Sequence, residues 1–177
     1  RVQVQPLPFA ESNLLAWLDE QPAGFQWLLA HTYSGVVWGR RDPQNGWQLP
    51  IVDINEVDKL REDENYLIID VREGFRYRGE SEPIDVVAGH IPGAINIPFA
   101  GNFHANGLFL PPEELKAKYT ATLENRKPEQ VVVHCGSGVT ACHTLLAMDQ
   151  AGLGIPKLYV GSWSEWSRND RPQATGE

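Results

Sequence analysis

Cysteine is scarce in this chain of 177 residues, which has only Cys135 and Cys142. Two cysteines are too few for the disulfide framework of a small secreted protein, and their spacing matches no metal-binding pattern. We therefore expect no bound metal, and no motif calls for a cofactor. The chain also lacks an apolar run of membrane-spanning length. No signal peptide is visible, although the chain starts at Arg1 rather than at methionine.

Positive charge is in short supply as well. The chain has 15 Lys and Arg against 23 Asp and Glu, a formal net charge of −8. This balance argues against binding to an anionic membrane surface and against direct binding of nucleic acid by the protein as a whole. The hydrophobic content of 42% is typical of a globular protein. The length allows one domain with a substantial core plus an appendage.

The most informative stretch is Val131–Ala141. The β-branched run Val131–Val133 predicts a buried strand, which breaks at Cys135 into a turn that carries Gly136 and Gly138. From Ala141 onward the apolar spacing is helical, and Gly152 is placed to end that helix. The sequence thus predicts a cysteine at the carboxyl end of a strand, on a glycine-containing loop that leads into a helix.

This position favours anion binding and nucleophilic chemistry. Consecutive backbone N–H groups of such a loop form an anion-binding nest, and the helix adds its positive N-terminal end. A thiol placed there ionises more easily, and the thiolate is the nucleophile. The alternative is a cysteine buried in the core, although such residues seldom lead straight into a Gly-x-Gly turn. A cysteine phosphatase needs an arginine six residues after the cysteine to clamp phosphate, and Ala141 occupies that position.

Residues 1–50 differ in character from the rest and are predicted to form a separate amino-terminal segment. They hold four of the six tryptophans, and their pattern predicts a short helix over residues 12–19 followed by a small antiparallel meander. Such a segment cannot bury these aromatic side chains by itself. We therefore expect it to pack on the following domain in part and to present an aromatic surface to a protein partner.

Residues 51–177 alternate between predicted strands and helices, which is typical of an α/β domain with a parallel sheet and helices on both faces. Asp53 has the spacing of a helix cap, and residues 66–70 form an apolar strand that ends in Asp70. Ligands of such sheets bind at the carboxyl ends of the strands. Asp70 and Cys135 are both expected at such ends, in one shared site.

Several motifs of this second segment together resemble the rhodanese-like sulfurtransferases, in particular the catalytic carboxyl-terminal half of the thiosulfate and 3-mercaptopyruvate enzymes. The resemblance covers residues 51–177. The motifs are Ile68-Ile69-Asp70-Val71-Arg72, Arg76-Tyr77-Arg78-Gly79, Gly89-His90-Ile91-Pro92-Gly93-Ala94, the loop Cys135-Gly136-Ser137-Gly138-Val139-Thr140, and Gly161-Ser162-Trp163-Ser164-Glu165-Trp166. The resemblance implies a rhodanese-like fold and a cysteine that carries a sulfane sulfur as a persulfide.

The same resemblance implies roles for individual residues. Cys135 and Ser137 are expected to be catalytic, with Cys135 as sulfur carrier and Ser137 in proton handling. Arg76 and Arg72 are expected to bind the donor, and Asp70 to give structural support. For Arg72 the alternative is a bracing ion pair. The loop residues that are expected to bind substrate through their backbone are Gly136, Gly138, Val139 and Thr140.

Because of two departures from the family pattern, the sequence does not decide between thiosulfate and 3-mercaptopyruvate as the sulfur donor. The inactive amino-terminal half of those enzymes has no counterpart here, and the acidic loop Glu80–Asp85 lacks the second arginine of mercaptopyruvate enzymes. We therefore expect a sulfurtransferase that moves sulfur from thiosulfate or 3-mercaptopyruvate to a thiophilic acceptor. A thiolate enzyme is expected in the cytoplasm, where thiols stay reduced.

Residues 12–50 carry a second, shorter resemblance. Trp27-Leu28-Leu29-Ala30-His31 and Gly35-Val36-Val37-Trp38-Gly39-Arg40 are similar to the opening of a small accessory family of type III CRISPR systems. This resemblance implies a different function class, a non-catalytic adaptor that uses the rhodanese-like portion as a scaffold. An adaptor tolerates the loss of Cys135, whereas an enzyme does not.

Overall fold

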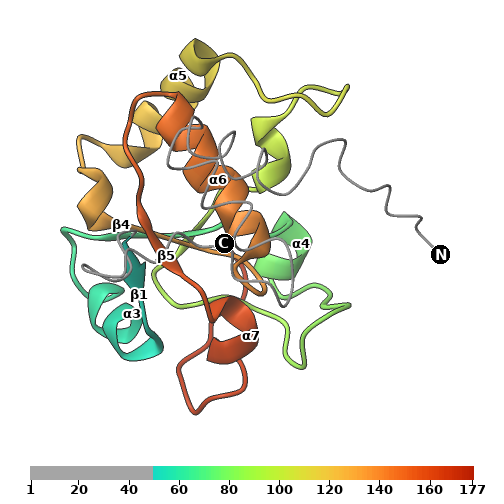
Figure 1. Cartoon of the computed structure of the whole chain (residues 1–177). Helices are drawn as coiled ribbons and strands as arrows, with labels where there is room; N and C mark the ends of the chain where they lie inside the picture. The colour runs from blue at the N-terminus through green and yellow to red at the C-terminus, as the bar shows by residue number, and fades with distance from the viewer. Residues whose placement is uncertain (1–49) are drawn as a thin grey trace, which may run out of the picture.

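The computed structural model describes residues 50–177, which fold around a five-stranded parallel sheet (Figure 1). The strand order across the sheet is β1-β5-β4-β2-β3. The strands are β1 (Ile51–Val52), β2 (Leu67–Asp70), β3 (Ile95–Asn96), β4 (Val131–His134) and β5 (Lys157–Tyr159). The predicted segment 1–50, with its helix and meander, lies outside the described residues except for Pro50.

Helices connect the strands. They are α3 (Ile54–Leu60), α4 (Gly74–Tyr77), α5 (Pro112–Leu123), α6 (Val139–Gln150) and α7 (Ser162–Trp166), with 3-10 turns η1 (Phe99–Asn102) and η2 (Pro128–Gln130). In Figure 1, α5 and α6 lie above the strands and α3 and α7 lie below them. The expected α/β fold with a parallel sheet and helices on both faces is therefore confirmed.

The sheet separates two hydrophobic clusters because side chains alternate along each strand. Ile69 and Val133 point to the cluster that α5 and α6 cover. Ile68 and Val132 point to the other face, where the indoles of Trp163 and Trp166 are fully buried. Both faces of β4 are covered, which is why its β-branched run shows no polar alternation.

The predicted start of α3 agrees with the structure, whereas that of α6 does not. The carboxylate of Asp53 accepts the N–H groups of Asn55 and Glu56 at 2.9 Å, so the predicted cap of α3 is present. Helix α6 begins at Val139, two residues before the predicted start. Gly138 has φ +81°, and a Cβ there would lie 2.8 Å from the carbonyl oxygen of Val160. This left-handed residue turns the chain at once into the helix.

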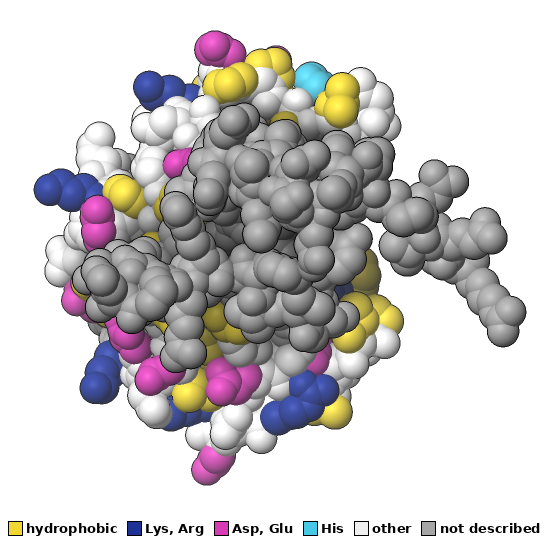
Figure 2. Space-filling view, in the orientation of Figure 1, with side chains coloured by type: hydrophobic (Ala, Val, Ile, Leu, Met, Phe, Trp, Pro, Cys, Tyr) yellow, Lys and Arg dark blue, Asp and Glu magenta, His cyan; other side chains and the backbone are white. Residues whose placement is uncertain are grey.

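Among residues 50–177, no helix combines the length and apolar character needed to cross a membrane. On the visible face in Figure 2, acidic and basic side chains of the described residues are interspersed around the edge. Where the described residues form that face, no single large basic patch is visible.

Candidate active site

Cys135 directly follows β4 at the carboxyl edge of the sheet. Its residue surface is 2% exposed. The last residue of the neighbouring strand β2 is Asp70, which pairs in register with His134. The structure therefore brings the ends of the two strands together, as the sequence predicted. After Cys135 the loop rises to the surface, where Ser137 is exposed.

The loop presents backbone donors that have no acceptor among the described residues. Within residues 50–177, the N–H groups of Gly136, Ser137 and Gly138 donate to no protein acceptor. Val139 and Thr140 follow in the first turn of α6, where backbone N–H groups have no partner inside the helix. These donors follow one another at a helix N-terminus, which is the position that the predicted anion-binding nest requires; the binding of an anion there stays a prediction.

Helix α7 supports the other side of the loop. The N–H of Trp163 donates to the carbonyl oxygen of Cys135 at 3.0 Å, and the N–H of Ser164 donates to that of Gly136 at 2.8 Å. The carbonyl oxygens of Cys135 and Gly136 therefore point toward α7. The backbone around the thiol is therefore fixed by a segment close to 30 residues later in the chain.

Arg76 lies beside the loop, but its guanidinium is already engaged. A Cβ added to Gly136 would lie 3.5 Å from Nη2 of Arg76. That Nη2 is 2.7 Å from Oε1 of Glu82 and 3.4 Å from Oδ2 of Asp85, and Nε donates to both oxygens of Glu82. Burial acts against the charged form, yet the hydrogen bond and charge of Glu82 raise the pKa of Arg76 above its usual value.

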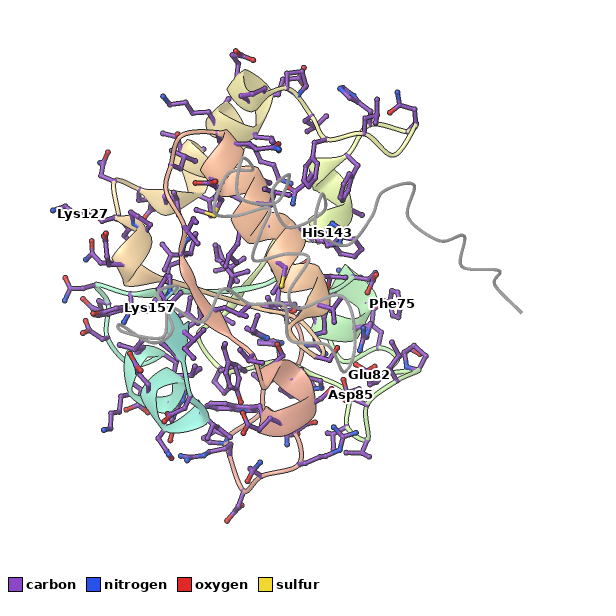
Figure 3. The ribbon with its side chains drawn as sticks, in the orientation of Figure 1. Phe75, Glu82, Asp85, Lys127, His143 and Lys157 are labelled. Atoms are coloured by element: carbon purple, nitrogen blue, oxygen red, sulfur yellow. The ribbon has the colours of Figure 1, made fainter. Side chains whose placement is uncertain are left out.

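The two carboxylates come from the acidic loop that runs past α4 and α7 (Figure 3). Glu82 is fixed from several sides, because its Oε1 also accepts the N–H groups of Ile84 and Asp85 at 3.1 Å. Although burial alone would raise the pKa of Glu82, its bonds to Arg76 and to these N–H groups lower it. Asp85 is tied to α7, since its Oδ1 accepts the hydroxyl of Ser164 at 2.5 Å.

Asp70 and Arg72 form a buried ion pair beneath this loop. Nη2 of Arg72 lies 2.6 Å from Oδ2 of Asp70, and both side chains are at most 1% exposed. Arg72 also donates to Glu82 at 3.1 Å and to the carbonyl oxygen of Gly89 at 2.6 Å, and its guanidinium covers the ring of Trp163. Asp70 is thus paired and buried at the end of β2. The guanidinium of Arg72 is enclosed by its partners, and this geometry favours the bracing alternative over contact with a substrate.

The neighbouring cysteine and histidine do not complete a nucleophilic pair. Cys142 is fully buried, and its thiol donates to the carbonyl oxygen of Gly138 at 3.0 Å. Burial, with the nearby Cys135, raises the pKa of Cys142 far above its usual value, so it stays a thiol. His134 is buried on the strand, and burial lowers its pKa.

Sequence reasoning found the loop and Arg76 but not the residues that hold them. It described residues 80–85 as an acidic loop without assigning partners to Glu82 and Asp85. It also gave no supporting role to Ser164 or to Arg168, whose Nη1 lies 3.3 Å from Oδ1 of Asp85. The signal available in the sequence was the proximity of Arg76 to Glu82 and Asp85, which follow it by 6 and 9 residues.

Residues 50–177 contain no group of three His, Cys, Asp or Glu side chains arranged to hold a metal ion. Among the described residues, the groups that lie at the site are the thiol of Cys135, the loop N–H groups and the Arg76 cluster.

Comparison with known proteins identifies relatives for the described domain. A family model for the rhodanese-like domain matches residues 53–169. The chain is 52% identical over 111 residues to a probable 3-mercaptopyruvate sulfurtransferase of Pseudomonas aeruginosa, an alignment covering 62% of this chain and 39% of the relative. It is 40% identical over 121 residues to the 3-mercaptopyruvate sulfurtransferase of Homo sapiens, covering 67% of this chain and 40% of the relative.

Among solved structures, the Tum1 protein from Saccharomyces cerevisiae aligns with a TM-score of 0.63 and 26% identity, covering 75% of this chain and 49% of that chain. The chain thus spans about two fifths of the length of the two curated relatives above.

Proposed function

The chain belongs to the rhodanese-like domain family, and on that premise we propose that it is a sulfurtransferase in which Cys135 carries sulfur as a persulfide. The observation that carries the proposal is the position of Cys135 at the end of β4, followed by three loop N–H groups without acceptors among residues 50–177. Two relatives named as sulfurtransferases support the reaction class.

In the first step, the thiolate of Cys135 attacks the outer sulfur of the donor. With thiosulfate, the S–S bond breaks and sulfite leaves, so that Cys–S⁻ becomes Cys–S–S⁻. With 3-mercaptopyruvate, the C–S bond breaks and its electron pair stays on carbon as the enolate of pyruvate. The thiol proton of the donor ends on that carbon, and pyruvate leaves. Ser137 is exposed on the loop and is proposed to relay that proton. The loop N–H groups stabilise the persulfide anion.

In the second step, a thiophilic acceptor takes the sulfur. Cyanide, for example, attacks the outer sulfur of the persulfide, gives thiocyanate and restores the thiolate of Cys135. Arg76 is proposed to hold the anionic group of the donor, because its guanidinium is the cation next to Gly136. No step requires an external oxidant: the outer sulfur of thiosulfate is already sulfane sulfur, and the carbon of 3-mercaptopyruvate that loses sulfur keeps the electron pair of the C–S bond.

The test is intact-mass spectrometry after treatment with thiosulfate or 3-mercaptopyruvate. We expect one added sulfur in the unmodified protein and in Cys142→Ser, and none in Cys135→Ser. The loaded protein should release thiocyanate on addition of cyanide. Sulfur on Cys142 in the Cys135→Ser variant would contradict the assignment. A well-folded protein that loads no sulfur from either donor would favour the adaptor function.

A further inference from the structure

Arg76 faces two carboxylates that differ in how firmly they are placed. Glu82 contacts Nε and Nη2 of Arg76 at 2.7–3.1 Å and is also held by two backbone N–H groups and by Arg72. Asp85 makes a single contact with Arg76, at 3.4 Å. Its other oxygen is bound to Ser164 and to Arg168. Glu82 therefore fixes the orientation of Arg76, whereas Asp85 is the carboxylate that can be displaced.

Asp85 is also the carboxylate next to the cysteine loop. A Cβ added to Gly136 would lie 3.7 Å from Oδ2 of Asp85 and 3.5 Å from Nη2 of Arg76. The contact between Arg76 and Asp85 thus lies directly against the residue after Cys135. A donor anion that binds Arg76 while its sulfur faces Cys135 has to take the place of Oδ2 of Asp85 or lie beside it.

Among residues 50–177, the charges around Arg76 leave no spare cation for a donor. The cluster contains three arginines and three carboxylates, so its formal charges cancel: Arg72, Arg76, Arg168, Asp70, Glu82 and Asp85. A fourth carboxylate, Glu73, lies 3.8 Å from Nη1 of Arg76 but is half exposed. An incoming anion therefore meets the charge of Asp85 at short range in a partly desolvated site, where Coulomb energies are several times larger than in water.

We infer that Asp85 is a specificity-determining residue that occupies the donor position on Arg76 and disfavours dianionic donors such as thiosulfate relative to the monoanionic 3-mercaptopyruvate. The inference rests on the proposed function. The repulsion from Asp85 scales with the charge of the donor, so a dianion meets about twice the repulsion of a monoanion. When a donor binds, Asp85 keeps its contacts with Ser164 and Arg168 and releases Arg76.

The experiment measures kcat/KM for both donors in the unmodified protein and in Asp85→Asn, which preserves shape and removes the charge. The ratio of the thiosulfate value to the 3-mercaptopyruvate value should rise about tenfold or more, equivalent to ~1.4 kcal/mol. A ratio that stays within about twofold of the unmodified protein overturns the inference, because a charge in direct contact with the donor site has to change the relative binding of donors that differ in charge.

Two matched variants distinguish the effect of the Asp85 charge from the effect of its hydrogen bonds on the structure of the loop. Glu73→Gln removes a charge near the same arginine from a half-exposed position, and the ratio should change less than about threefold because solvent screens it. Ser164→Ala removes the hydrogen bond to Asp85 but keeps its charge. If Ser164→Ala raises the ratio as much as Asp85→Asn does, Asp85 acts by bracing the loop and the inference fails.

Should Asp85→Asn not fold, Arg168→Gln tests the inference from the opposite side. Arg168 has a 50% exposed side chain and draws Asp85 away from Arg76, so its loss should lower the thiosulfate-to-mercaptopyruvate ratio. An unchanged ratio overturns the inference.

A binding measurement separates this inference from the proposed function. Absence of sulfur transfer from both donors contradicts the proposed function but leaves Asp85 testable in the Cys135→Ser background, which cannot turn over. Calorimetric titration with thiosulfate should show about tenfold tighter binding when Asp85→Asn is added to that background. Equal affinities of the two variants would overturn the role of Asp85.

Discussion

The hydroxyl of Ser162 accepts the backbone N–H of Cys135 at 3.1 Å. The same hydroxyl donates to the carbonyl oxygen of Tyr159 at 2.9 Å, and both of these hydrogen bonds are buried. Ser162 has φ +54°, a left-handed conformation that is uncommon for a residue with a side chain. The side chain of Ser162 thus links the end of β5 to the end of β4, where the cysteine loop begins.

Replacing Ser162 by alanine should destabilise the protein by about 1–3 kcal/mol, because the buried N–H of Cys135 and the carbonyl of Tyr159 lose their partner. Ser167→Ala is the matched control. Its hydroxyl is also buried, but it has no hydrogen-bond partner among residues 50–177, so its removal should cost little. Urea denaturation of both variants measures the difference. Equal losses would show that the Ser162 hydroxyl adds nothing beyond its volume.

Arg72 should contribute far more to stability than Arg78. Removing Arg72 leaves the carboxylate of Asp70 buried without its cation and takes from Glu82 one of its two arginine partners. The expected cost is about 3–5 kcal/mol. The pair of Arg78 with Glu80 is exposed to solvent and should contribute little to stability. Thermal unfolding of Arg72→Met and Arg78→Met compares them. A small effect of Arg72→Met would mean that the buried carboxylates find other partners.

The stabilities of Gly138→Ala and Gly152→Ala together test how closely the cysteine loop packs against Val160. Both have positive φ, +81° and +70°, so alanine is strained at either position by about 1 kcal/mol or more. At Gly138 the new Cβ would also lie 2.8 Å from the carbonyl oxygen of Val160, whereas nothing described lies within 4 Å at Gly152. Gly138→Ala should therefore be the more destabilising and should slow sulfur loading. Similar stability of the two variants would show that the segment at Val160 shifts freely.

The strand, loop and helix around Cys135 could be predicted because their signals are local. A β-branched run, two glycines and a helical repeat lie within about 20 residues, and each element depends on its own sequence. The start of α6 was placed two residues late because only the structure reveals the left-handed turn at Gly138. The shared edge of Asp70 and Cys135 followed from the general rule for parallel sheets.

The environment of Arg76 could not be predicted, because it depends on the path of an irregular loop. Sequence reasoning treated Arg76 as a cation available to a donor and Arg72 as a second one. In the structure Glu82 bridges both arginines, and Asp85 meets Ser164 from 79 residues further along the chain. No periodic pattern encodes such contacts, since they arise from tertiary packing of a loop. The roles of Ser137 and of the loop N–H groups remain predictions.

His134 should make stability depend on pH in a defined window. Burial lowers the pKa of His134, and Arg72 acts in the same direction, while Asp70, 3.8 Å away, opposes them. The unfolded chain binds a proton at this residue below about pH 6.5, but the folded protein keeps the ring neutral until a lower pH. Stability is therefore fully present above about pH 6.5 and falls as the pH drops toward the lowered folded pKa, by up to ~1.4 kcal/mol per pH unit.

Urea denaturation between pH 7.5 and 5.5 tests this expectation, in a range above the normal titration of carboxylates. His134→Asn should be less stable at pH 7.5, because the buried imidazole is lost from the core, but its stability should vary less with pH. Burial also lowers the pKa of His143 on α6, so the variant should keep part of the slope and the double variant His134→Asn/His143→Gln should lose most of it. An unmodified protein whose stability stays constant over this range, or a His134→Asn variant with the full slope, would show that His134 does not remain neutral in the fold.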